Sequence, residues 1–130
     1  MKRIIIWIIV AGFVLLLGSA GYTFNQIYRQ VTRITELAKS EFSGDAVKAL
    51  SSLIESDAYG FEEKNTAIWA LGQLADPAAL PFLEELNAKT KDDTIPFDRS
   101  SGLSNYEIEK AIKWCQKGNL TSWMYGKIRQ

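Results

Sequence analysis

Side chains that could do chemistry are few in this chain of 130 residues, and their types exclude most kinds of catalytic centre. The sequence contains no histidine, so triads, proton relays and metal sites that depend on imidazole are excluded. Its single cysteine, Cys115, falls at an apolar position of a helical pattern and has no histidine to activate it. This setting favours a buried thiol over a nucleophile. We therefore expect no catalytic residue, no cofactor and no metal ion, and a protein that is not an enzyme.

The acidic side chains give weak signals. The adjacent residues of Glu62-Glu63 and of Glu84-Glu85 point about 100 degrees apart on a helix, so neither pair can share a proton. Asp92, Asp93 and Asp98 offer oxygen ligands for a hard cation, but the spacing and the glycine of an EF-hand are absent. We interpret the first pair as compensation of a helix dipole, the second as solvated, and the aspartates as part of a charged loop.

Apolar side chains in polar surroundings are the candidate partner contacts. One group lies in the irregular stretch from Thr90 to Leu103, which is long for a connection within a compact domain. Such residues either fold back onto the core or form a contact patch. A second group, near the end of the chain, either closes the open end of a helical stack or contacts a partner. The candidates are Ile95, Pro96 and Phe97 in the first group and Trp123 and Tyr125 in the second.

The elements that must position these residues are short amphipathic helices. Residues 65–86 read as two helices separated by Asp76-Pro77, because Asp76 can cap a helix and Pro77 suits the first helical position. Gly72, inside the first of these helices, predicts the close approach of a neighbouring helix. Ser104, with Glu107 three residues later, predicts a further helix start by a capping box.

The chain also repeats itself. Shifted by 33 positions, residues 46–53 fall on residues 79–86 with a similar apolar pattern. Shifted by 44 positions, Glu63, Ala67 and Ile68 fall on Glu107, Ala111 and Ile112. The extra residues of the second shift lie between Thr90 and Leu103. Two helix pairs with one insertion are typical of an α-solenoid, in which short helices bury a face only by stacking.

The best-preserved junction resembles a known family. Residues 67–86 run from Ala-Ile-Trp-Ala-Leu-Gly through Asp-Pro-Ala-Ala-Leu into the next helix, and they resemble the HEAT repeats first noted in phycobilisome lyase subunits. The resemblance is weaker over residues 45–58 and 106–118, where Trp114-Cys115-Gln116 replaces Ala70-Leu71-Gly72. It implies a right-handed stack of antiparallel helix pairs used mostly as a protein-binding scaffold. It does not imply lyase activity.

The N-terminus reads as a membrane segment. Residues 4–22 carry no charged side chain and would span roughly 28 Å as a helix, close to the hydrocarbon thickness of a bilayer. One interpretation is a signal peptide, with Gly18 and Ala20 supplying the small residues that a peptidase needs. The other is an uncleaved anchor, which we favour because the apolar character persists to Tyr22. We expect the N-terminus in the cytoplasm and the domain outside it.

Residues 23–42 continue the helix with one apolar stripe. The stripe fits two heptads, with Phe24, Val31 and Ala38 at one seam position and Ile27 and Ile34 at the other. Either two chains pair along it, or it is a stalk whose far end packs on the domain, which is the interpretation we favour. The 15 basic and 15 acidic side chains leave no dominant basic patch, which argues against a nucleic-acid partner.

The sequence thus predicts an all-α chain with a membrane helix in residues 1–22, a stalk in residues 23–42 and a HEAT-like domain in residues 43–130. That domain is a short α-solenoid of about two helix pairs. The predicted function is a membrane-anchored adaptor that binds a membrane or envelope protein. One alternative is a ligand-binding or lyase-type accessory subunit whose groove is lined by Trp69, Trp114 or Glu63. Another is a secreted domain released by cleavage near Ala20.

Overall fold

The computed structural model describes residues 1–90 and 102–130. Across these residues the chain forms helices and no strand, which confirms the all-helical prediction. The chain divides into two compact units, Met1–Gln30 and Val31–Gln130. The predicted contacts at Ile95, Pro96 and Phe97 lie outside the described residues.

The first unit is the N-terminal part of one long helix, α1 (Lys2–Glu41). Its apolar side chains are exposed, as Trp7 at 73% and Leu15 at 74% illustrate. By length and composition this helix can cross a membrane, although a signal sequence at the N-terminus would pass the same test. The helix runs without a break through Ala20, so the segment predicted to span the membrane and the segment after it form one element.

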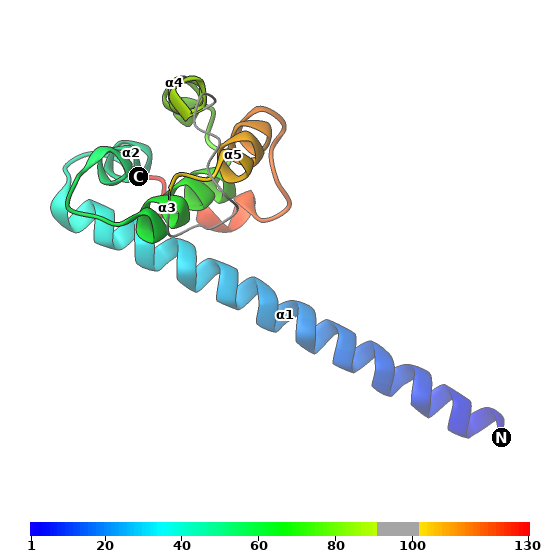
Figure 1. Ribbon diagram of the computed structural model, residues 1–130. Coiled ribbons are helices and arrows are strands. Elements are labelled where there is room, and N and C mark those ends of the chain that lie inside the picture. The colour runs from blue at the N-terminus through cyan, green and yellow to red at the C-terminus, as the bar shows by residue number, and fades with distance from the viewer. Residues whose placement is uncertain (91–101) are drawn as a thin grey trace. The chain divides into compact units, whose positions relative to one another are not determined.

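The second unit holds the end of α1 and four further α-helices. These are α2 (Ala46–Glu55), α3 (Phe61–Leu74), α4 (Leu80–Thr90) and α5 (Asn105–Lys117), with short 3-10 helices η1 (Pro77–Ala79) and η2 (Ser122–Tyr125). Helix α2 packs on α3, α4 packs on α5, and α3 packs on α5. Helix α3 therefore lies between α2 and α5 (Figure 1). These contacts match the two predicted helix pairs.

The apolar stripe at the end of α1 packs in the core of the second unit. Val31, Ile34 and Ala38, which are seam residues of the predicted heptads, are buried in the second unit. This burial favours the stalk whose far end packs on the domain over pairing of two chains along the stripe. A hydrogen bond with the carboxylate of Glu41, at the end of α1, is the main cause that raises the pKa of Tyr59. The loop between α2 and α3 is thus linked to the end of α1.

Side-chain caps begin three of the helical segments, and two of them, at Asp76 and Ser104, are those predicted above. The predicted capping box is only half formed, because the Ser104 N–H donates to the side chain of Asn65 and not to Glu107. A cap side chain accepts a hydrogen bond from a backbone N–H that the helix leaves without a partner. The pairs are Asp45 with Lys48 N–H at 2.9 Å, Asp76 with Ala78 N–H at 3.0 Å, and Ser104 with Glu107 N–H at 3.3 Å. The first turn after Asp76 is a 3-10 turn, and α4 begins only at Leu80.

Gly72 lies where α3 meets α5, which confirms the predicted close approach. A Cβ built on Gly72 would lie 2.9 Å from the Cα of Ala111 and 2.9 Å from Cε3 of Trp114. Real Cβ atoms do not come this close to backbone carbon, so only glycine lets the helices reach this separation. Leu71 and Ile108, from the same two helices, are fully buried.

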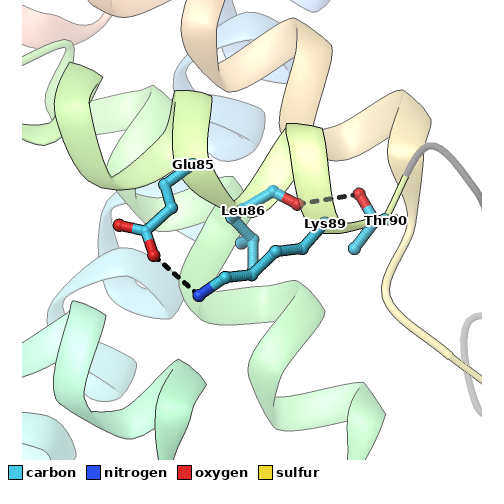
Figure 2. Close-up of polar contacts among 4 residues, drawn as sticks. All are labelled: Glu85, Leu86, Lys89 and Thr90. Atoms are coloured by element: carbon cyan, nitrogen blue, oxygen red, sulfur yellow. Dashed lines mark hydrogen bonds and ion pairs between the residues drawn. The ribbon is translucent and has the colours of Figure 1, made fainter.

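The end of α4 is held by local contacts (Figure 2). The Thr90 hydroxyl donates to the carbonyl oxygen of Leu86 at 3.0 Å. The ammonium of Lys89 lies 2.7 Å from the carboxylate of Glu85, and both side chains are about two-thirds exposed. This pairing lowers the pKa of Glu85. Exposed ion pairs stabilise proteins little, so the burial of Leu83 and the packing on α5 must hold α4 in place.

Candidate interaction surface

Both ends of the insertion are fixed by hydrogen bonds across the domain. The side-chain amide of Asn105 donates to the carbonyl oxygen of Thr90 at 3.2 Å, which joins the end of α4 to the start of α5. Asn65, fully buried on α3, donates to the carbonyl oxygen of Gly102 at 2.9 Å and accepts from the Ser104 N–H at 2.8 Å. Residues 90 and 102–105, on either side of the insertion, are therefore held at one place on the helices.

Three side chains on α5 form a stripe that begins beside this place. Tyr106 is 67% exposed, and the ammonium of Lys110 lies 5.4 Å from the centre of its ring. The same ammonium lies 4.7 Å from the ring centre of Trp114, one further turn along. Cations over aromatic faces are attracted by the ring quadrupole, so the Lys110 ammonium links the two rings. We call Tyr106, Lys110 and Trp114 the α5 ridge.

The segment after α5 closes the C-terminal end of α3. The side-chain amide of Asn119 donates to the carbonyl oxygens of Gly72 at 3.1 Å and Gln73 at 3.2 Å. The guanidinium of Arg129 donates to the carbonyl oxygen of Leu74. These carbonyls belong to the last turn of α3, where helices have few internal donors and positive charge is favoured, and the Gly72 carbonyl also accepts from the Ala75 N–H. We call Asn119 and Arg129 the α3 clamp.

The clamp holds two large apolar side chains in an exposed position. Leu120 and Trp123 are each 79% exposed, whereas Thr121 and Tyr125 beside them are buried. The Thr121 hydroxyl donates to the side-chain oxygen of Gln73 at 2.5 Å, which attaches the segment that carries Leu120 and Trp123 to α3. We call Leu120 and Trp123 the C-terminal patch.

The candidate contacts near the C-terminus fall on opposite sides of the backbone. Trp123 is available to a partner, but Tyr125 is fully buried and packs in the core, so its side chain offers no contact surface. Sequence reasoning missed Asn65, Asn119 and Arg129, whose partners lie 37 to 55 residues away. The one local signal was an asparagine directly after Gly118, and by itself it reads as an ordinary turn.

The side chains considered above for catalysis or ligand binding differ in their burial. Cys115 is buried as expected, and burial is the main cause that raises the pKa of its thiol to about 11, so the thiol stays protonated at neutral pH. Glu63 is exposed in the first turn of α3, and Trp69 is half-buried further along that helix. In the part of the chain that the structure describes, no group of three or more Cys, Asp or Glu side chains could hold a metal ion.

Comparison with known families gives one result. A sequence model of the PBS lyase HEAT-like repeat matches residues 64–86, which include most of α3, η1 and the beginning of α4. No curated protein and no solved structure gave a match to the chain. The matched segment contains the Asp76-Pro77 break and the Gly72 contact. The chain therefore contains a HEAT-like repeat at the junction between its two helix pairs.

Proposed function

We propose that this protein is a membrane-anchored adaptor, not an enzyme, whose HEAT-like domain binds another protein. The N-terminal part of α1 lies in the bilayer, with the N-terminus in the cytoplasm and the domain outside it. Together, α2 to α5 form a short α-solenoid that presents the α5 ridge and the neighbouring insertion to the partner. The partner is a membrane or envelope component, since the domain stays at the membrane surface.

The observation that carries the proposal is the exposure of Tyr106 on the α5 ridge. HEAT-like repeats commonly mediate protein interactions, and rigid aromatic side chains are the residue type most enriched at the centres of such interfaces. Tyr106 is 67% exposed, and a tyrosine side chain has only two rotatable χ angles, so little conformational freedom is lost on binding. It also lies one residue after Asn105, at the fixed root of the insertion that carries Ile95, Pro96 and Phe97.

Anchoring is supported by the first unit. Residues 4–22 are uncharged and form part of a continuous helix whose apolar side chains are exposed to the surroundings. Exposing this much apolar surface to water is unfavourable, whereas a bilayer accommodates it. The mass of the mature protein distinguishes an anchor from a signal peptide cleaved near Ala20. A reporter that is active only outside the cytoplasm, fused after Gln130, tests the orientation.

Photocross-linking from Tyr106 tests the protein contact. A photoreactive phenylalanine analogue replaces Tyr106 in the full-length protein, and cells are irradiated before their membranes are isolated. We expect one dominant adduct with a second protein. The matched control carries the analogue at Glu84, which is exposed on α4, and should give no such adduct. Equal adducts from both positions, or none from a stably made Tyr106 variant, would refute the role of the ridge.

A double substitution tests the insertion separately. Ile95→Asp combined with Phe97→Asp places charge on the predicted apolar contact without touching the ridge. We expect the captured partner to be lost from detergent co-purification. Unchanged recovery would remove the insertion from the interface and leave the ridge as the contact.

A further inference from the structure

We propose that the C-terminal patch, Leu120 and Trp123, contacts the anionic headgroup region of the bilayer that holds α1. The proposal rests on the anchoring proposed above and assigns the domain a second surface, separate from the α5 ridge. The ridge then serves the protein partner, and the patch sets how the domain lies on the membrane.

Hydrogen bonds to α3 hold the C-terminal patch in an exposed position. Leu120 and Trp123 are each 79% exposed, the largest exposed fractions among the large apolar side chains described in the second unit. They are not on a loose tail, because Asn119 and Thr121 hydrogen-bond to the end of α3 on one side and Arg129 does so on the other. Two large apolar groups held outward by a partly buried polar network indicate a contact surface.

The chemistry around the patch fits anionic lipid. Tryptophan favours the headgroup level of a bilayer, where its apolar ring and polar N–H are both accommodated. Lys117 and Lys127 are exposed and flank the patch in the sequence, and residues 117–130 contain no acidic side chain. Lysines next to an apolar insertion bind anionic headgroups electrostatically. The patch therefore combines apolar and positive character.

The α5 ridge differs in its charge. Glu107 and Glu109 lie beside it, and the ammonium of Lys110 is engaged by the rings of Tyr106 and Trp114. The ridge therefore lies among acidic as well as basic side chains, whereas residues 117–130 carry only basic ones, which is why we assign the bilayer to the patch.

The tether keeps the domain within reach of the bilayer. Eight residues, 23–30, separate the end of the apolar stretch at Tyr22 from the start of the second unit at Val31. These residues belong to α1, so as a helix they cover about 12 Å. A domain of this size has a radius of gyration of about 13 Å, so its surface stays close to the headgroups.

Fluorescence quenching by lipid tests the contact in the full-length protein. The protein is reconstituted in vesicles of phosphatidylcholine and phosphatidylglycerol, some of which carry bromine on the acyl chains near the headgroup. Trp7→Phe removes the tryptophan of the apolar stretch. The difference in emission between this variant and a variant that also carries Trp123→Phe gives the emission of Trp123. We expect brominated lipid to quench the Trp123 component strongly and to leave the Trp69 and Trp114 emission nearly unchanged. Trp123 emission that brominated lipid does not quench would overturn the proposal.

Charge reversal tests the lysines. In phosphatidylglycerol vesicles we expect each lost lysine to lower the equilibrium constant for patch contact by about fivefold, so Lys117→Glu with Lys127→Glu should abolish the quenching of Trp123. Lys48→Glu with Lys113→Glu is the matched control, because it reverses two exposed lysines on α2 and α5 and should leave the quenching unchanged. Equal effects of the two sets of substitutions would refute the role of the lysines and of the patch.

Two readouts separate failure of this proposal from failure of the anchoring. In the Trp123→Phe variant, Trp7 reports the apolar stretch, and its quenching by bromine on mid-chain positions shows that this stretch is inserted. Quenching of Trp7 without quenching of Trp123 rejects the patch contact alone. Absence of both rejects the anchoring as well. If Trp123 is shielded from aqueous acrylamide yet not quenched by lipid, a protein or a second copy covers the patch, and the proposal is wrong.

Discussion

Replacing Gly72 by alanine probes the contact between α3 and α5. The added Cβ would lie 2.9 Å from the Cα of Ala111 and 3.1 Å from its Cβ, and also 2.9 Å from Cε3 of Trp114. Ordinary contacts between such carbons are about 3.5 to 4.0 Å, so the helices must separate or the indole must turn. The indole is itself held against Lys110 at 4.7 Å, and the Ala111 backbone cannot rotate away.

Two opposing contributions set the magnitude. Alanine is favoured over glycine inside a helix by about 1 kcal/mol. Overpacking a close-packed contact costs about 1 to 3 kcal/mol, and the backbone atom at Ala111 places this site in the upper part of that range. We therefore expect Gly72→Ala to lower the free energy of unfolding by about 1 to 2 kcal/mol.

Urea unfolding of the full-length protein in mild detergent, followed by tryptophan fluorescence, measures this change. For a small domain the expected loss lowers the midpoint by about 0.5 to 1 M urea. Gly126→Ala is the matched control: a Cβ there meets nothing within 4 Å, and the backbone φ of −52° suits any residue. That variant should be unchanged or more stable by up to about 1 kcal/mol. A Gly72→Ala protein as stable as the Gly126→Ala protein would refute the proposed close contact.

Three further predictions concern groups that hold the domain together. Asn65→Ala removes two buried hydrogen bonds and should cost about 2 to 3 kcal/mol, with faster amide exchange at Ser104; unchanged exchange would contradict the assigned contact. Arg129→Met removes the donor to Leu74 at the end of α3 and should cost about 1 to 2 kcal/mol in urea unfolding, while Lys127→Met, a nearby exposed control, should cost nothing measurable. The pKa of Cys115 is raised from 9.0 to about 11, so the folded state holds this proton more tightly than the unfolded state and stability falls as pH rises through this range. The loss reaches about 2 to 3 kcal/mol at most, and Cys115→Ala should flatten the alkaline decline of the unfolding midpoint; an identical decline in both proteins would rule out the thiol as its cause.

Much of the helical framework was predictable from the sequence because its signals are local. The caps at Asp45, Asp76 and Ser104 act on N–H groups two or three residues away, so their spacing marks the helix starts directly. The role of Gly72 was also readable, since a glycine inside a helix is costly unless a neighbour requires it. Which helix is that neighbour was not predictable, because Ala111 and Trp114 are about forty positions away in the sequence.

The candidate surface was only partly predictable. Trp123 and Tyr125 are both aromatic and two residues apart, and nothing in their local sequence tells which one faces water. The answer depends on how the segment attaches to α3 through Asn119 and Arg129. The stripe at the end of α1 shows the same limit, because Val31 and Ala38 suit a coiled coil or a domain core equally well.

By itself the sequence determined the apolar stretch at the N-terminus, the helices with their side-chain caps, and the HEAT-like junction at Asp76-Pro77. Each of these follows from composition or from interactions within one or two helical turns. Only the tertiary structure decided which helices meet and that Asn65 binds Gly102 and Ser104, where the chain leaves the insertion. It also decided that Leu120 and Trp123 stay exposed while Tyr125 is buried. These features depend on contacts between residues far apart in the chain, whose pairing no local pattern encodes.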